Sequence, residues 1–241
     1  MRRIFALIIC LVSQLHAIDL PKDCQQLVVG SAKDWNSSYV TLTVYQKKDQ
    51  TWQRTIAPWQ GRLGKNGLAW GVGLHNNPKN ATVKKEGDLR TPAGLFRIGG
   101  AWGYDKKIQK KDTLPYRQVT SRDLWVEDST SDKYNRHVII DHEPATEWEK
   151  QQQMKQNDAA HALKLFIAHN APPKPKPQAG SSIFFHIWRN GGKNATAGCT
   201  TMDATALKNL IAIIDPQLHP CYLILPESEL QKTRKLGKLP N

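Results

Sequence analysis

The chain has 241 residues and a formal net charge of +13, with 39% hydrophobic and 23% charged residues. This length is enough to bury a sizeable core as a single domain. The basic charge favours anionic partners such as cell-wall polymer, lipid head groups or nucleic acid. Because the lysines are dispersed and no DNA- or RNA-reading motif accompanies them, we expect no nucleic-acid partner.

The N-terminal segment MRRIFALIICLVSQLHA, residues 1–17, has the arrangement of a secretory signal peptide. Two arginines precede an apolar run, and small or polar residues lead to a cleavage site after Ala17. The apolar run is shorter than the roughly 20 residues that a membrane span requires. We therefore expect an exported protein with no integral membrane segment after cleavage of the signal peptide.

Short strands dominate the first half of the chain. After a lead-in over residues 18–38, the stretch YVTLTVYQ from Tyr39 alternates apolar and polar residues, which predicts a half-buried strand. Glycines and prolines break up the sequence that follows, and no period of 20–50 residues repeats, so a solenoid is not expected. Further strands are predicted within residues 51–74, at 95–98, at 124–128 and at 136–141.

The second half of the chain differs in composition from the first. Residues 145–170 are rich in helix formers, with apolar residues at spacings of three and four, and predict a helix. Four prolines within residues 171–180 predict a loop. We interpret 145–178 as an insertion and expect it to act as a lid, because it directly precedes the next strand.

The remaining elements are a strand at 182–188, a helix at 203–215 that begins at the N-cap Asp203, a strand at 221–226 and a charged tail at 227–241. Many short strands with few helices predict a mainly β (α+β) fold, built as one domain with helical insertions.

Three cysteines remain after signal cleavage, namely Cys24, Cys199 and Cys221. An exported compartment permits disulfides, and an odd number of cysteines leaves one thiol over. Cys24 and Cys221 lie near the two ends of the mature chain, which commonly approach each other in compact domains. We therefore expect a Cys24–Cys221 disulfide and a free Cys199, although the sequence leaves the other pairings open.

In the segment GSSIFFHIWRNGGKNATAGCTTMD, residues 180–203, twelve residues separate His186 from Cys199, in a loop rich in glycine and asparagine. A neighbouring imidazole can take the proton of a thiol, which leaves a thiolate–imidazolium pair and a strong nucleophile. The backbone N–H groups of Gly198 and Cys199 would then face an oxyanion. The alternative interpretation is a small buried cysteine beside a core histidine.

Several segments resemble, in the correct order, the L,D-transpeptidase (YkuD-like) catalytic-domain family. GSSIFFHIW and ATAGCTTM resemble its active-site signature, in which a strand histidine precedes a Ser/Thr-x-Gly-Cys loop, here Thr196 to Cys199. KKEGDLRTPAGLFRIGGAWGY, residues 84–104, is similar to the family's EGD…TPAG.F segment. LPYRQVT and WVEDSTSDKYNR are similar to the branch with a longer insertion, and the resemblance covers a catalytic domain over 39–226.

This resemblance implies a β-sandwich or barrel that acts on peptidoglycan stem peptides in the periplasm or cell wall. Cys199 would attack the carbonyl of the third stem residue, expel the terminal D-alanine and pass the acyl group to an amine, which forms a 3–3 cross-link. His186 would act as base and then as acid, oriented by the backbone carbonyl of Ile187. With water as the acceptor the protein would be an L,D-carboxypeptidase, and a catalytically idle wall-binding module is a third alternative.

Two positions depart from the family pattern. Ala197 stands where many relatives have histidine, and Thr201 stands where many carry an arginine that can meet a substrate carboxylate. Which residue replaces that arginine is open. The candidate substrate-binding residues are Thr196, Thr200, Thr201, Trp188, Arg189, Tyr134 and Asn135.

No metal site is expected. His137 and His142 would lie on opposite faces of a predicted strand, so we do not expect them to share an ion. The resemblance implies no cofactor, and the sequence does not report the oligomeric state.

Overall fold

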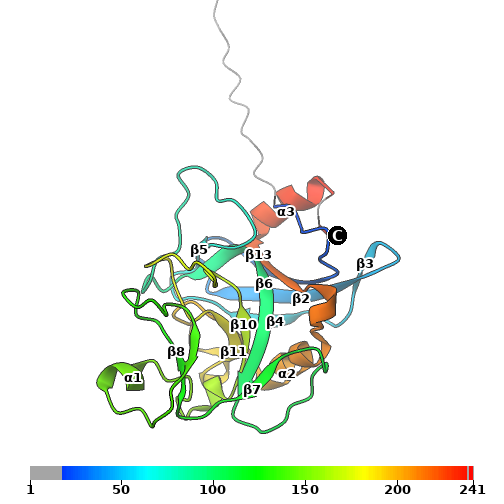
Figure 1. Ribbon diagram of the computed structural model, residues 1–241. Coiled ribbons are helices and arrows are strands. Elements are labelled where there is room, and N and C mark those ends of the chain that lie inside the picture. The colour runs from blue at the N-terminus through cyan, green and yellow to red at the C-terminus, as the bar shows by residue number, and fades with distance from the viewer. Residues whose placement is uncertain (1–17, 238, 241) are drawn as a thin grey trace, which may run out of the picture.

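Eight strands close into a mixed β-barrel in the computed structural model, which describes residues 18–237, 239 and 240 (Figure 1). Around the barrel they follow the order β1 (Gln26–Ala32), β13 (Cys221–Pro226), β6 (Thr91–Gly103), β10 (Leu163–Ile167), β11 (Phe184–Ile187), β12 (Thr200–Met202), β4 (Trp59–Arg62) and β2 (Tyr39–Lys48). β2 pairs with β1 and completes the circle. The predicted mainly β fold is therefore confirmed, in the form of a closed barrel.

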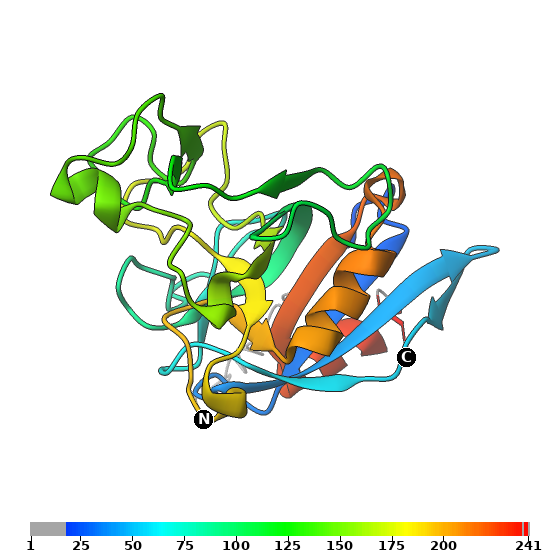
Figure 2. The same ribbon diagram turned by 90° about the horizontal axis from the view of Figure 1, so that it is seen from below.

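Shorter elements surround the barrel. The additional strands are β3 (Thr51–Arg54), β5 (Leu68–Trp70), β7 (Tyr116–Gln118), β8 (Asp123–Trp125) and β9 (His137–Ile139). The helices and 3-10 turns are α1 (Glu147–Gln151), η1 (Ala159–His161), η2 (Asn190–Gly192), α2 (Ala204–Ile213), η3 (Pro216–Leu218) and α3 (Glu227–Lys235). β8 and β9 form a separate two-stranded sheet, and Figure 2 shows them with α1, in green, as a lobe on one side of the barrel.

Strand alternation fills the barrel interior. In β2 the residues Val40, Leu42 and Val44 are fully or almost fully buried, as their spacing predicts, while the residues between them are partly exposed. α2 begins at Asp203, whose side chain accepts a hydrogen bond from the Ala206 N–H at 2.9 Å. The predicted helix at 203–215 and its cap are thereby confirmed.

The predicted helix over 145–170 is wrong for most of its length. Only α1 is α-helical there, and residues 163–167 form the barrel strand β10, between β6 and β11. In LKLFI the apolar residues Leu163, Leu165 and Ile167 also recur at every second position, the period of a strand. Pairing on both edges decides between the two patterns, because the barrel cannot close without a strand at this place.

Both ends of the described chain are more ordered than the sequence predicts. Residues 26–32, placed in the lead-in, form β1, which is paired on both sides in the barrel wall. The segment 227–241, predicted as a charged tail, begins with α3, in which Leu230 is fully buried. The expected signal peptide, residues 1–17, lies outside the described residues.

Candidate active site

Neighbouring strands bring one row of side chains to the outer face of the barrel. Lys164 on β10, His186 on β11 and Thr201 on β12 are partners in successive strand pairs. Directly opposed residues in paired strands point to the same face of a sheet. That face looks away from the barrel core, because the adjacent Phe185 packs inward against Tyr222, with ring centroids 4.6 Å apart.

His186 is fixed by the chain itself. Its Nδ1 lies 2.9 Å from the backbone oxygen of Ile187, so Nδ1–H donates to that carbonyl and Nε2 keeps its lone pair. The side chain is buried, with 8% of the residue exposed. Burial lowers the pKa of His186 to about 3, with a further contribution from the neighbouring His161. The imidazole is therefore neutral at rest, as a general base must be.

The Cys199 thiol lies against β11 and the segment before it. The Phe184 N–H donates to Sγ at 3.4 Å, and Sγ donates to the carbonyl of Ser182 at 3.4 Å. Burial raises the pKa of Cys199 to about 11, although the Phe184 N–H and the ammonium of Lys164 act in the opposite direction. The thiol is therefore neutral at rest, and the predicted resting thiolate–imidazolium pair is replaced by two neutral groups. For this thiol to act as a nucleophile, it would have to lose its proton during the attack.

The hydroxyl of Thr196 clamps the cysteine loop. Its Oγ1 donates to the Cys199 carbonyl at 2.7 Å and accepts from the Gly198 N–H at 3.0 Å. The Gly198 N–H of the predicted oxyanion hole is thus engaged within the loop, and its role toward an oxyanion stays a prediction. The Cys199 N–H has no hydrogen-bond partner in the described part of the chain and is the donor left for an oxyanion.

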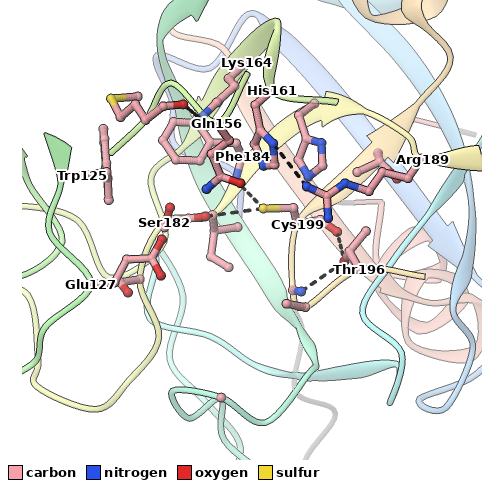
Figure 3. A pocket seen from close by; sticks show the side chains of 18 of the residues that line it. Trp125, Glu127, Gln156, His161, Lys164, Ser182, Phe184, Arg189, Thr196 and Cys199 are labelled. Carbon is pink, nitrogen blue, oxygen red and sulfur yellow. Dashed lines mark hydrogen bonds between the residues drawn. The ribbon is translucent and has the colours of Figure 1, made fainter. Parts of the chain in front are cut away.

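Cys199 and His186 line one cavity of about 360 Å³. Figure 3 shows Cys199 between Glu127 on one side and His161 and Arg189 on the other. The charged and titratable residues of its wall are Lys84, Glu86, Glu127, His161, Lys164 and Arg189. The lining therefore carries both acidic and basic groups around the thiol.

A family model described as the YkuD L,D-transpeptidase catalytic domain matches residues 36–220. The chain belongs to this family.

Two crystal structures of Pgp2, a helical cell shape determining protein from Campylobacter jejuni, resemble this YkuD chain, one of them from a point mutant. Each has a TM-score of 0.42 and 12% sequence identity, and they cover 90% and 92% of this chain. The chain spans about half of their length, 55% and 56%. No curated protein matches the chain.

The candidate substrate-binding residues of this YkuD domain fall into two groups. Thr196, Thr201 and Arg189 line the cavity. The other four lie outside its lining, and strand alternation explains one of them, since Thr200 points inward to the hydroxyl of Tyr222, at 3.2 Å. The remaining three are Trp188, Tyr134 and Asn135.

Tyr134 and Asn135 support the wall of the cavity from behind. The Tyr134 hydroxyl donates to Glu86 at 2.5 Å. Asn135 is fully buried, and its Oδ1 accepts from the Ser182 N–H at 3.0 Å, while its Nδ2 donates to the Asn170 carbonyl at 2.7 Å. Both residues thus hold segments that line the cavity without reaching it themselves.

Several wall residues were not among the candidates from the sequence. Lys164 could have been recognised from the sequence, because it is the only charged residue in the apolar stretch LKLFI. His161 and Glu127 could not have been recognised in this way, since their place beside the YkuD cysteine depends on how the lobe folds back onto the barrel. Only part of the segment 145–178, which was predicted to act as a lid, lies at the cavity. Residues from 152 to 164 contribute to its lining, whereas none from the proline-rich loop 171–179 does.

Cys24 lies just before β1 and Cys221 begins β13, the strand paired with β1, and both cysteines are part of the same buried core. Both are buried and unbonded in the structure, so the disulfide stays a prediction. Among residues 18–237, 239 and 240 of this YkuD chain, no helix is long and apolar enough to cross a bilayer.

Proposed function

We propose that the protein is an exported peptidoglycan-modifying cysteine enzyme that acts on the L,D-peptide bond of stem tetrapeptides. Membership of the YkuD family supports a cell-wall substrate and an extracytoplasmic location. The observation that carries the proposal is the hydrogen bond from His186 to the carbonyl of Ile187, which leaves Nε2 as a base in the cavity that holds the Cys199 thiol.

In the first half-reaction the Cys199 sulfur attacks the carbonyl of the third stem residue as its proton passes to Nε2 of His186. The Cys199 N–H stabilises the oxyanion. The tetrahedral intermediate then collapses, the C–N bond breaks, and His186 returns the proton to the amine of the departing D-alanine. A thioester on Cys199 and a neutral imidazole remain.

The second half-reaction depends on the acceptor. Transfer to the side-chain amine of another stem forms a 3–3 cross-link and makes the protein an L,D-transpeptidase. Transfer to water releases a tripeptide and makes it an L,D-carboxypeptidase. Both outcomes use the same acyl-enzyme, so the first half-reaction tests the site independently of the acceptor.

Mass spectrometry of purified stem tetrapeptides incubated with the mature protein tests this proposal. Cys199→Ala and His186→Gln are the test variants, and His142→Gln, at an exposed histidine outside the cavity lining, is the matched control. Cross-linked dimers that require Cys199 support the transpeptidase, and tripeptide alone supports the carboxypeptidase. Absence of any Cys199-dependent product would contradict both and favour a wall-binding module.

A further inference from the structure

A second histidine lies directly on the first. The rings of His161 and His186 stack with centroids 5.0 Å apart and an interplanar angle of 22°. His161 comes from η1, at the end of the lobe segment that precedes β10, and it lines the cavity together with Cys199 (Figure 3). The proposed attack on the stem peptide uses only His186, which leaves the second imidazole without an assigned role.

His161 is anchored by a carboxylate. Asp158 caps η1 through Oδ1, which accepts from the His161 N–H at 2.9 Å and from Nδ1 of its ring at 2.7 Å. The other oxygen, Oδ2, accepts from Arg189 at 2.6 Å. Burial acts to raise the pKa of Asp158, but these hydrogen bonds outweigh burial and lower it to about 2. The anchor is therefore ionised at any working pH.

The anchor fixes the tautomer of His161. Because Nδ1–H donates to the ionised Asp158, Nε2 carries the lone pair, and no described residue hydrogen-bonds to it. With 16% of its side chain exposed, the ring is in contact with solvent as well as with the cavity. His161 thus presents a basic nitrogen whose orientation is set by a carboxylate, as in other acid–base sites.

The two imidazoles cannot exchange a proton with each other. The N–H bonds and lone pairs of an imidazole lie in its ring plane, whereas stacked rings meet through their faces. Each ring therefore serves a different group. Two imidazolium ions in contact would also repel each other, so only one ring of the pair is protonated to the imidazolium at a time.

Charged and titratable groups from three segments of the chain surround His161 and influence its pKa. Asp158 lies on its own turn, Lys164 on β10, and His186 and Arg189 on and after β11. Burial and the ammonium of Lys164 lower the pKa of His161, and Asp158 partly opposes them. The ring is neutral near pH 7 and is able to accept a proton. A carboxylate anchor stabilises the imidazolium that results more than the carbonyl anchor of His186 does.

We propose that His161 is a second proton-transfer residue of this cavity, which takes the proton of the acceptor that attacks the Cys199 thioester, while His186 serves the sulfur during acylation. This inference rests on the proposed function. Asp158 is a positioning residue, because it acts through His161.

In this step the bond that forms to the acceptor replaces the C–S bond, and each proton has a stated destination. The lone pair of the acceptor amine or water forms a new C–N or C–O bond, and its proton passes to Nε2 of His161. The C–S bond then breaks, and its electron pair stays on the sulfur of Cys199. The thiolate recovers a proton from solvent and His161 releases one to solvent, which restores the neutral thiol and both neutral imidazoles.

Intact-protein mass spectrometry with a stem tetrapeptide separates the two half-reactions. In His161→Gln we expect the Cys199 acyl-enzyme to form within about 3-fold of the wild-type rate and to accumulate, while turnover falls by about 100-fold or more. In His186→Gln we expect the acyl-enzyme not to form. Wild-type turnover in His161→Gln, or an equal loss of acylation and turnover, would overturn the inference.

Asp158→Asn provides a second variant that keeps the cap of η1, because asparagine also caps helices. Without the carboxylate the pKa of His161 falls, so the acid limb of deacylation moves to lower pH and the maximal deacylation rate drops by about 10-fold. The pH profile of acylation stays in place. An acid limb that does not move would overturn the inference. Failure of the wild-type protein to acylate would overturn the proposed function and this inference with it.

Discussion

Lys164 on β10 is the cross-strand partner of His186 on β11, so an ammonium group lies beside the imidazole that shares a cavity with Cys199. Only 5% of Lys164 is exposed, and its Nζ donates to the carbonyl of Met154 at 2.8 Å. Burial lowers the pKa of Lys164 to about 8, with the nearby acidic groups and Cys199 acting against it. Lys164 is therefore positively charged at neutral pH and loses this charge as the pH rises above about 8.

Lys164→Met should make the Cys199 thiol less reactive. The ammonium lowers the pKa of Cys199, so its removal raises that pKa and decreases the thiolate fraction at a given pH. We expect alkylation of Cys199 by iodoacetamide at pH 7, where Lys164 is still protonated, to slow by roughly 3- to 10-fold, because each pKa unit changes the thiolate fraction tenfold. Lys208→Met, at an exposed position of α2, is the matched control. Equal or faster alkylation would contradict the role of Lys164.

Thr196→Val should loosen the cysteine loop. The change removes the hydroxyl that holds the Cys199 carbonyl and the Gly198 N–H. Misplacement of a nucleophile by a fraction of an ångström lowers the rate substantially, and we expect kcat/KM to fall by about 10- to 100-fold. Thr196→Ser keeps the hydroxyl and should retain most of the activity. Equal kinetics in the two variants would exclude a role for this clamp.

Thr201→Val should stabilise the fold. Thr201 is 1% exposed, and its Oγ1 is buried with no hydrogen-bond partner among the described residues. Replacing an orphaned buried hydroxyl with a methyl group should raise the free energy of unfolding by about 1 kcal/mol. Thr200→Val should instead lower it by about 1–3 kcal/mol, because the buried Tyr222 hydroxyl loses its partner. Urea unfolding measures both, and a loss of stability in Thr201→Val would contradict the prediction.

Asp123 should contribute to stability at neutral pH but not in acid. Burial acts to raise the pKa of this carboxyl, but hydrogen bonds from Arg117, Thr120 and His137 outweigh it and lower the pKa to about 2. A carboxyl with a depressed folded-state pKa stabilises the fold above its unfolded pKa of about 3.9, and this stabilisation is lost as the pH falls towards 2. We expect Asp123→Asn to cost about 2.5 kcal/mol at pH 7, at about 1.4 kcal/mol per pKa unit. In urea unfolding the two proteins should converge near pH 2, and a gap that does not depend on pH would exclude this origin.

Cys24 and Cys221 should form a disulfide once the protein is oxidised. The bridge would close most of the barrel into one loop, and in the chain-entropy account loops of 100 residues or more are stabilised by about 4–5 kcal/mol. We expect iodoacetamide to label Cys199 alone in the oxidised, unreduced protein after unfolding in urea, because Cys24 and Cys221 are buried in the folded protein. We expect Cys24→Ala to lower stability by more under oxidising than under reducing conditions. Cys199→Ala is the control. Label on Cys24 or Cys221 without prior reduction would contradict the pairing.

The sequence predicted the parts of the site that are local in the chain. Cys199, His186 and the Ile187 carbonyl lie within fourteen consecutive residues, so one strand and one loop are enough to bring them together. The strand alternation of β2 and the cap of α2 were likewise visible, because each depends on a few neighbouring residues.

The wall of the cavity could not be predicted in the same way. His161 reaches His186 only because β10 pairs with β11, and the sequence favoured a helix where β10 lies. The apolar spacing of residues 160–167 fits a helix and a strand alike, so only the partners on both edges distinguish the two. Thr200 and Thr201 were equal candidates for the same reason, since the sequence does not state which face of β12 looks inward.

The closure of the barrel through β1 has a consequence for the order in which the chain can fold. β1 pairs in parallel with β13, and the paired residues Leu27 and Cys221 stand almost at opposite ends of the described chain. Contacts between such distant segments form late, because the whole intervening loop must be ordered first. A chain that is synthesised from its N-terminus therefore cannot complete its barrel until the last barrel strand, β13, has followed. A chain that ends before residue 221 would leave the barrel open between β1 and β6, because β13 is the strand that joins them.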